Sequence, residues 1–420
     1  MLDSAQSRRI TAGRGLLARP RELTASETSV GLWFGNMHRL RVALILNGMT
    51  FTGSSRVAYE VFSRLNQRLR LRVMSLHDGP MRSRFEQVAP VSILPAQSFF
   101  DYLKTDGVRA CLSAFPRKPL VKASIALRKP DVVYVNSVCA LPALNCLSFG
   151  DAGIIVHVHE LDRHLRQALR DHSDLLLNRP RRYIAVSNAT RDALIRFGVS
   201  ADRITVVHNS LSREAYADHT QKPRTDGKFV IGGAGDVNWS KGTQLWVQMA
   251  AEVVRLVGEN AVKFVWLGVD NSGASLEFEE TARKLNVWHL IDFLPTNENP
   301  MDVFKTFDVL AVSSWEETFS LVALECMSLG KVAVCFADNG GTPEVIGDTG
   351  VCVPDFSPRL MAESIVELMK NPERMRRLGA AARERATTRF RLDTQLEAVY
   401  DVIMQVAAQR TRPQGAPERA

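Results

Sequence analysis

The feature that most constrains this chain is a regular alternation of short apolar runs with longer amphipathic segments, from Leu40 to about residue 405. Such alternation is typical of β–α units, in which helices join and cover parallel strands. Most of the apolar runs are rich in Val and Ile without polar alternation, as expected of strands buried on both faces. The pattern therefore predicts an α/β fold with parallel sheets.

The predicted strands form two sets, separated by a polar stretch that carries almost no apolar residue. Because 420 residues exceed what one compact core usually holds, we expect two domains, at 39–215 and 229–390, with a linker at 216–228. An amphipathic segment at 391–408 has no strand after it and is expected to return to the first domain as a helix. The predicted strands are Arg41–Leu46, Leu71–Ser75, Asp131–Asn136, Gly153–His157, Arg182–Val186 and Ile204–His208, then Phe229–Ala234, Lys263–Gly268, Leu290–Phe293, Asp308–Val312, Lys331–Phe336 and Gly350–Val353.

The two ends of the chain lack this pattern. Residues 1–38 are rich in Arg, Ser, Thr and Gly, which predicts a disordered extension and makes Met37 a credible start; residues 409–420 are expected to fray. The six cysteines never form a C-x-x-C pair, and no run reaches the roughly 18 apolar residues that span a bilayer. We therefore expect a cytoplasmic protein with reduced thiols.

The charge balance favours an anionic partner. The chain has 53 basic and 45 acidic residues, a formal net charge of +8, which suits a nucleotide phosphate, an anionic lipid surface or nucleic acid. With 7% aromatic residues and no basic cluster interleaved with stacking rings, nucleic acid is not expected. The segment Arg117–Lys129 alternates basic and apolar residues, so it is either a plain surface helix or a peripheral contact with an anionic inner-membrane surface.

The segment Ser313–Gly330 carries two carboxylates that follow a predicted strand. Ser320 can cap a helix that ends at Gly330, which places Glu317 in the loop and Glu325 within the helix. Since ligands of open α/β sheets bind at the carboxyl ends of strands, both side chains can face a bound ligand. The alternative is that they merely favour the helix N-terminus and solvent; the apolar neighbours of Glu325 count against it.

These residues resemble a known donor-binding signature. Glu317 and Glu325, followed by Gly330-Lys331 and by Gly340-Gly341-Thr342-Pro343-Glu344, look like the motifs of family 4 retaining glycosyltransferases. The resemblance implies the GT-B fold, in which two Rossmann-like domains face each other across a cleft. It also implies that Glu317 lies against the donor sugar, that Glu325 binds ribose, and that backbone amides of Phe319, Ser320, Leu321 and Val322 hold the pyrophosphate.

Three other segments gain a role from the same resemblance. Lys241 follows a glycine turn and would meet the distal phosphate, and the loop around Gly53 would close over the diphosphate. His159 would face the reacting sugar and the acceptor, although a structural histidine at a strand end is the alternative reading. The sequence also departs from the family, because Asp236 and Ser240 stand where an arginine often clamps phosphate, Ser320 replaces a common glycine, and Ser210 follows Asn209 where Asn-Gly is usual.

The resemblance implies glycosyl transfer with retention from a nucleoside diphosphate sugar to a glycan or lipid-linked acceptor, in polysaccharide or glycan biosynthesis. Neither a metal nor a cofactor is expected, since Lys241 and helix amides can stabilise the leaving diphosphate. Three alternatives remain at this stage: a sugar-nucleotide epimerase of the same fold, a dinucleotide oxidoreductase, and a catalytically silent binding subunit. The oxidoreductase is disfavoured because its Gly-x-Gly-x-x-Gly motif would need glycine at Asn238.

Overall fold

A computed structural model describes residues 39–94, 129–211, 227–270, 272–297 and 299–410. The first of its two sheets has seven strands in the order β3-β2-β1-β4-β5-β6-β7, and every neighbouring pair is parallel. Its strands are β1 (Arg41–Gly48), β2 (Arg70–His77), β3 (Val91–Ile93), β4 (Val132–Asn136), β5 (Gly153–Val158), β6 (Arg182–Ala185) and β7 (Ile204–Val206).

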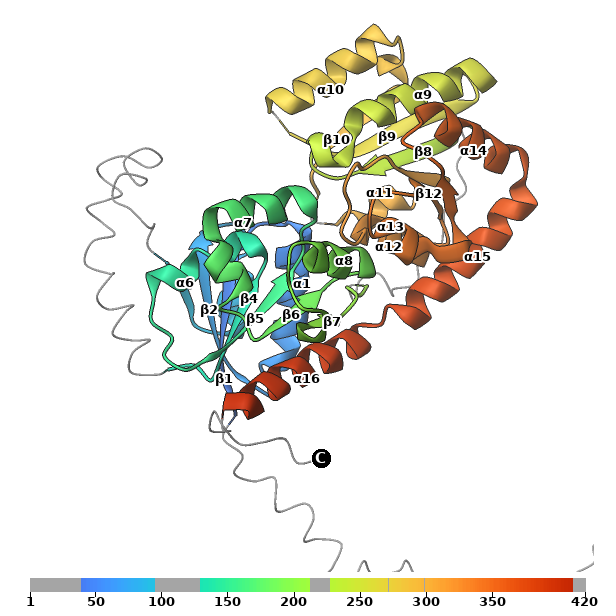
Figure 1. The fold of residues 1–420 in the computed structure, drawn as a ribbon. Helices are drawn as coiled ribbons and strands as arrows, with labels where there is room; N and C mark the ends of the chain where they lie inside the picture. The colour runs from blue at the N-terminus through green and yellow to red at the C-terminus, as the bar shows by residue number, and fades with distance from the viewer. Residues whose placement is uncertain (1–38, 95–128, 212–226, 271, 298, 411–420) are drawn as a thin grey trace, which may run out of the picture. The chain divides into compact units, whose positions relative to one another are not determined.

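The second sheet repeats this arrangement with six strands. Its order is β10-β9-β8-β11-β12-β13, again with all pairs parallel, so the same crossover pattern occurs twice in the chain (Figure 1). This is the strand order of doubly wound nucleotide-binding folds. Its strands are β8 (Phe229–Ala234), β9 (Val262–Val269), β10 (Ile291–Pro295), β11 (Val309–Val312), β12 (Val332–Phe336) and β13 (Val351–Val353).

Helices connect the strands and cover both sheets. Those of the first half are α1 (Gly53–Leu65), α2 (Arg82–Val88), α6 (Ala143–Cys146), α7 (Asp162–Leu177) and α8 (Asn188–Arg196). Those of the second half are α9 (Thr243–Val257), α10 (Gly273–Lys284), α11 (Met301–Phe304), α12 (Leu321–Ser328), α13 (Thr342–Ile346), α14 (Pro358–Lys370), α15 (Pro372–Arg389) and α16 (Leu392–Arg410). Short 3-10 turns lie at η1 (Val138–Ala140), η2 (Ala201–Arg203), η4 (Trp239–Lys241), η5 (Trp288–Leu290) and η6 (Gly347–Thr349).

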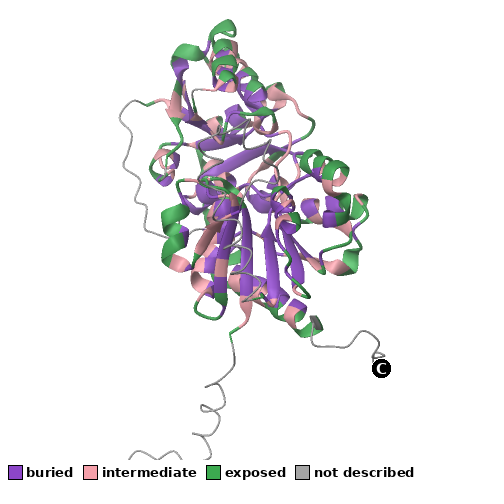
Figure 2. Cartoon of the chain, turned by 90° about the vertical axis from the view of Figure 1, so that its left-hand side faces the viewer, coloured by how far each residue is buried: buried purple, intermediate pink, exposed green. Residues whose placement is uncertain are grey.

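The strands are buried on both faces, which explains why they lack polar alternation. In β1, Val42, Leu44 and Leu46 join a core that includes α1, whereas Ala43 and Ile45 join the core on the opposite face. Every residue of β4, β5, β11 and β12 is buried, and Figure 2 shows the purple strands inside a partly exposed layer of helices. The predicted α/β class with two parallel-sheet, Rossmann-like domains is therefore confirmed.

Helix α16 packs against the first sheet although it follows the second. Val399, Val402, Ile403 and Val406 are buried in the core beside α1, and α16 contacts β5 (Figure 1). The helix runs to Arg410, two residues past the predicted limit of 408. The described residues from Leu40 onward belong to one compact unit.

Other expectations are corrected or fall outside the described residues. Either Ser54 or Ser55, which follow the glycine of the loop around Gly53, could cap a helix, but α1 begins at Gly53 and the Ser55 hydroxyl donates to Gly48 O at 2.8 Å. Strand β3 was not expected, because three residues are too few to show a pattern. The extension 1–38, most of the segment Arg117–Lys129, linker residues 216–226 and tail residues 411–420 lie outside the described ranges.

A steric test of the second sheet follows from Gly232 in β8. A Cβ atom there would overlap the ring of Phe307, which is fully buried, whereas a Cβ at Gly273 would have nothing within 4 Å. We expect Gly232→Ala to lower the free energy of unfolding by about 1–3 kcal/mol, as for other overpacked cores. The matched change Gly273→Ala should leave it nearly unchanged. Urea denaturation of both variants measures this, and equal midpoints would contradict the packing described.

Candidate active site

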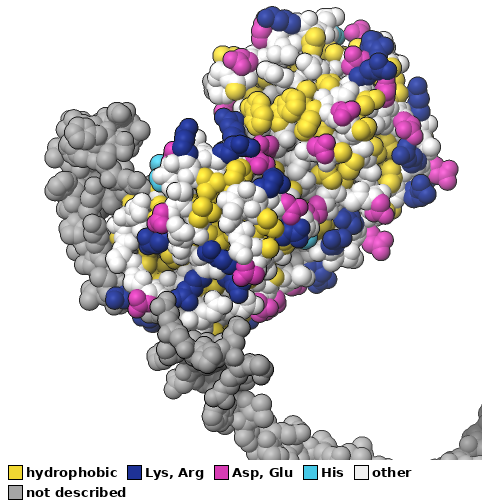
Figure 3. All heavy atoms as spheres, viewed as in Figure 1, with side chains coloured by type: hydrophobic (Ala, Val, Ile, Leu, Met, Phe, Trp, Pro, Cys, Tyr) yellow, Lys and Arg dark blue, Asp and Glu magenta, His cyan; other side chains and the backbone are white. Residues whose placement is uncertain are grey.

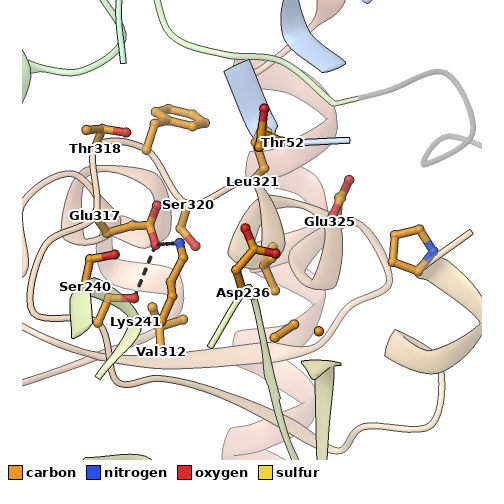
Figure 4. Close-up of a pocket in the computed structure, with 18 of the residues that line it drawn as sticks. Thr52, Asp236, Ser240, Lys241, Val312, Glu317, Thr318, Ser320, Leu321 and Glu325 are labelled. Carbon is orange, nitrogen blue, oxygen red and sulfur yellow. Dashed lines mark hydrogen bonds and ion pairs between the residues drawn. The ribbon is translucent and has the colours of Figure 1, made fainter. Parts of the chain in front are cut away.

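The candidate site lies where the carboxyl ends of both sheets meet. In each sheet the strand order reverses beside the first strand, between β1 and β4 and between β8 and β11, and ligands of such folds bind at these positions. A cavity of about 390 Å³ opens there, and residues that follow β1, β5, β8 and β11 line it. Its size is in the range of small-molecule sites. The residues from the first half that line it include Thr52, Gly53, Ser54, Arg56 and His159. Those from the second include Asp236, Lys241, Glu317, Ser320 and Glu325, which are labelled in Figure 4.

Two helix N-termini converge on this cavity. Gly53 begins α1 and Leu321 begins α12, and a Cβ atom on Gly53 would lie 3.3 Å from Leu321 Cδ1. The first backbone N–H groups of a helix have no acceptor within the helix, and the helix dipole makes this end positive. Ser320 caps α12 as predicted, its hydroxyl accepting from Ala323 N at 3.3 Å. The amides of Leu321 and Val322 at the cavity wall can therefore bind an anion.

Lys241 and Glu317 meet in the cavity as an ion pair. Lys241 Nζ lies 2.6 Å from Glu317 Oε2, and Figure 4 shows the two side chains pointing toward one another. The Ser314 hydroxyl donates to the same carboxylate oxygen at 3.3 Å. Gly242, with φ +59°, permits the turn after Lys241 to pass close to Ser313. The side chains predicted to contact donor sugar and distal phosphate are thus adjacent.

The paired glycines of the Gly340-Gly341 motif hold the loop of Glu317. Glu317 N donates to Asn339 O at 2.7 Å, and Gly341 N donates to Glu317 O at 2.6 Å. A Cβ on Gly341 would overlap Thr318 O, so any larger residue would push this loop away. The motif therefore supports Glu317 from behind and contributes no side chain to the cavity.

Glu325 is buried within α12 and pairs with an arginine from the first half of the chain. Its side chain is 5% exposed, and Arg56 Nη2 lies 2.7 Å from its Oε1. Arg56 sits in α1, one turn after Gly53. The alternative that Glu325 is a solvated helix residue is wrong, because burial beside Leu324, Cys326 and Met327 removes it from bulk water.

His159 is a neutral side chain at the end of β5. Burial lowers the pKa of His159 to about 3. Asn136 Nδ2 donates to Ser54 O at 3.1 Å, so its Oδ1 is left to accept from His159 Nε2–H at 3.2 Å. In this tautomer Nδ1 carries the lone pair. The neighbouring His157 is fully buried, and its Nδ1 lies 2.7 Å from the Tyr134 hydroxyl.

Glu160 fixes the backbone that carries His159. It accepts hydrogen bonds from His159 N at 2.9 Å, from Val138 N at 3.2 Å and from the Ser137 hydroxyl. Burial raises the pKa of Glu160, although these donors act in the opposite direction. Ser137 has φ +90°, a strained conformation for a residue other than glycine. The network joins the ends of β4 and β5 at the cavity wall.

Glu344, the last residue of the glycine motif, lies away from the cavity lining. It accepts from Asn188 N at 2.8 Å and lies 2.5 Å from His208 Nε2. Burial alone would raise the pKa of Glu344, but the hydrogen bonds from His208 and Asn188 outweigh it and lower the pKa. Glu344 thus ties the second sheet's loop to segments that follow β6 and β7.

The structure brings all the predicted site residues to one cavity. Arg56, Ser314 and Glu160 also line it and were not predicted to, although Glu160 adjoins His159 in the sequence and Arg56 follows Gly53 by one helical turn. Asn136, which was not predicted either, contacts His159. Within the described ranges, no group of three or more His, Cys, Asp or Glu side chains could hold a metal ion. The predicted residues that line the cavity are Gly53, His159, Lys241, Glu317, Phe319, Ser320, Leu321, Val322 and Glu325.

Comparison with known families agrees with this arrangement. Residues 51–214 match the family described as Glycosyltransferase Family 4, and residues 216–385 match Glycosyl transferases group 1. The two matches adjoin and together cover both sheets. The chain belongs to the family 4 glycosyltransferases. The resemblance carried by Glu317, Glu325 and the glycine motif is thereby confirmed at the level of the family.

Curated relatives of this family 4 glycosyltransferase are distant. It is 27% identical over 259 residues to a D-inositol 3-phosphate glycosyltransferase of Corynebacterium diphtheriae, covering 57% of this chain and 59% of that protein. It is 23% identical over 368 residues to spore coat protein SA of Bacillus subtilis, covering 79% of this chain and 97% of that protein. The chain spans about three-fifths of the length of the inositol phosphate enzymes from C. diphtheriae and C. aurimucosum, with 59% and 61% covered.

Solved structures share the GT-B fold with this family member. HepE of Anabaena in complex with UDP and glucose superposes with a TM-score of 0.71 at 18% identity, covering 87% of this chain and 100% of that one. WaaG, a glycosyltransferase of lipopolysaccharide biosynthesis, gives a TM-score of 0.66 at 14% identity, covering 89% and 100%. At these identities the similarity establishes the fold alone.

The other predicted partner is an anionic membrane surface. On the face shown in Figure 3, Lys and Arg side chains are interspersed with Asp and Glu. None of the helices in the described ranges is both long and apolar enough to cross a membrane. The basic segment predicted to touch an anionic membrane lies outside the described ranges except for Lys129, so that contact stays a prediction.

Proposed function

We propose that this protein transfers a sugar from a nucleoside diphosphate sugar to an acceptor hydroxyl, with retention of the anomeric configuration. The observation that carries the proposal is the convergence of two helix N-termini and Lys241 on one cavity that also holds Glu317 and Glu325. A diphosphate needs cationic and N–H donors, and a sugar nucleotide also needs acceptors for its hydroxyl groups. The cavity offers both kinds of group.

In the proposed reaction, negative charge develops on the leaving diphosphate. The amides that begin α12 and the ammonium of Lys241 would stabilise that charge by preorganised electrostatics, so neither a metal ion nor a cofactor is required. Glu325 would accept from the ribose hydroxyls, and Glu317 would lie against the sugar. Donor binding must then share Lys241 between Glu317 and the distal phosphate.

The acceptor is proposed to be a glycan or a lipid-linked glycan in cell-surface polysaccharide assembly, at the cytoplasmic face of the membrane. WaaG, a glycosyltransferase involved in lipopolysaccharide biosynthesis, supports this class. Several sequence relatives are instead named D-inositol 3-phosphate glycosyltransferases, so inositol 3-phosphate is a second acceptor to examine. HepE was solved with UDP-glucose, which makes UDP sugars the first donors to examine.

The proposal is tested in two steps. A thermal-shift screen over UDP-, GDP-, ADP- and TDP-sugars identifies the donor base, because a bound ligand raises the melting temperature. Release of nucleoside diphosphate is then measured with and without candidate acceptors, in the presence of EDTA. NMR of the product shows the anomeric configuration. Release of free nucleotide from the donor in water already excludes a silent binding subunit, whereas conversion to an isomeric sugar nucleotide would indicate an epimerase.

His159 is predicted to act at the acceptor side and not in nucleotide binding. Its neutral ring contacts Asn136. It reaches the cavity from the end of β5, whereas Lys241 comes from the segment that follows β8. We expect His159→Ala to lower the transfer rate by roughly 10²- to 10⁴-fold if it takes part in proton transfer, with nucleotide affinity almost unchanged. Loss of nucleotide binding by a folded variant would contradict this placement.

The pH dependence of His159 follows from the same burial. Because the folded pKa is about 3, below the roughly 6.5 of an unfolded histidine, the unfolded chain takes up a proton first as pH falls. The contribution of His159 to stability is complete above about pH 6.5 and is lost between that pH and about 3. The rate profile of the free enzyme should therefore show no titration of His159 between pH 5 and pH 8.

A further inference from the structure

Acidic side chains outnumber cationic ones in the lining of the cavity. Among the described lining residues, five carboxylates face three side chains that are always cationic at neutral pH. The loop that carries Lys241 offers no second cation, because Asp236 and Ser240 occupy it. Any other cation for the phosphates must come from a different element. The carboxylates are Glu160, Asp236, Glu316, Glu317 and Glu325, and the cations are Arg56, Arg84 and Lys241.

Arg56 is the lining residue best placed to be the second cation that contacts the phosphates. It lies in the first turn of α1, whose N-terminal residues Thr52 and Gly53 also line the cavity, and it is held by Glu325 at 2.7 Å. Its side chain is 34% exposed, so it reaches the cavity from a partly buried position. Arg84 instead lies with its guanidinium 5.4 Å from the ring centroid of Phe51.

The pairing with Glu325 favours the proximal phosphate as the one that Arg56 binds. A guanidinium has five N–H donors in a planar fork, and a carboxylate has about four acceptor positions, so each group can hold its partner and a ligand at once. In a nucleotide the proximal phosphate follows the ribose through a single carbon. With Glu325 at the ribose hydroxyls, an arginine bonded to it would lie nearer the proximal phosphate than the distal one.

We propose that Arg56, supplied by the first domain, is the second phosphate ligand of the donor site and binds the proximal phosphate while it holds Glu325. This inference rests on the proposed function. It divides the diphosphate between two cations from two domains, with Lys241 at the distal phosphate. Arg56, on α1, would then take the place of the arginine that is missing from the loop of Asp236.

The test compares uridine, UMP and UDP on wild type, Arg56→Ala and Arg56→Lys, using isothermal titration with uridine measured by competition. If the donor screen selects GDP, the guanosine series takes their place. Arg64→Ala is the matched control, since Arg64 lies on the same helix and pairs with Glu60 at 2.7 Å. We expect Arg56→Ala to weaken UMP and UDP alike, by roughly 10- to 100-fold, and uridine by less than about threefold. Arg56→Lys should recover part of this loss, and Arg64→Ala should resemble wild type.

Each other outcome has a separate meaning. If Arg56→Ala lowers the affinities for uridine, UMP and UDP equally, Arg56 only orients Glu325. If Arg56→Ala raises these affinities, Arg56 merely occupies the site when no ligand is bound. A loss confined to UDP would place it at the distal phosphate. Each of these overturns the inference. If wild type binds no nucleoside diphosphate and no sugar nucleotide, the proposed function fails first and this inference fails with it.

Discussion

Replacement of Lys241 by alanine is expected to reduce the rate of glycosyl transfer by roughly 10²- to 10³-fold, the usual effect of removing one preorganised donor from a developing negative charge. Lys241 follows the end of β8 and faces the cavity, where Glu317 holds it at 2.6 Å. Donor turnover is the measurement. The folded state should be almost unaffected, because this partly exposed ion pair contributes little to stability.

Lys263→Ala is the matched control for this change. Lys263 also forms an ion pair, with Asp292 at 2.6 Å on the neighbouring strand, but it does not line the cavity. Turnover should therefore stay at the wild-type value. Binding of UMP distinguishes Lys241 from Arg56: Lys241→Ala should spare UMP and weaken UDP if the lysine meets the distal phosphate. If Lys241→Ala leaves UDP affinity intact, the lysine only positions Glu317.

Much of the fold was predictable because its signal is local. Strands covered on both faces must be apolar throughout, so β4, β5, β11 and β12 are visible as continuous runs of Val, Ile and Ala. Strand β3, with three partly buried residues at the sheet edge, carries no comparable signal. The end of α16 was placed too early because its C-terminal residues, Ala408 to Arg410, continue the helix without a glycine or proline.

The site was predictable to the extent that its residues follow strands in a recognisable order. Glu317, Lys241 and His159 each stand just after a strand, and parallel strands bring these positions to one edge. Arg56 could not be assigned in this way, because its partner Glu325 is 269 residues away and the pairing depends on how the two halves meet. The same holds for Glu344, because its partners Asn188 and His208 are more than 100 residues away in the sequence and no local pattern indicates these contacts.

The two glutamates should have separable roles, because the structure gives them different partners. Glu325 is buried beside Arg56 in α12, whereas Glu317 lies in the preceding loop against Lys241 and Ser314. A ribose diol held by Glu325 would form charge-assisted hydrogen bonds worth about 1.5–3 kcal/mol each. Glu325→Gln should therefore weaken the bare nucleoside diphosphate and the intact sugar nucleotide alike, by roughly 10- to 150-fold per bond lost.

Glu317→Gln should behave in the opposite way toward the bare nucleotide. Without the carboxylate charge, Lys241 no longer has to divide its charge between Glu317 and the distal phosphate, so affinity for UDP should be retained or increased. The intact donor and the transfer rate should suffer, because the sugar loses its acceptor. Titration of UDP and UDP-sugar into both variants measures this, with Glu363→Gln, on the outer surface of α14, as the control. Identical affinity profiles for Glu317→Gln and Glu325→Gln would refute the assignment, because loss of a carboxylate that binds ribose must weaken the bare nucleotide, whereas loss of one that binds only the sugar must not.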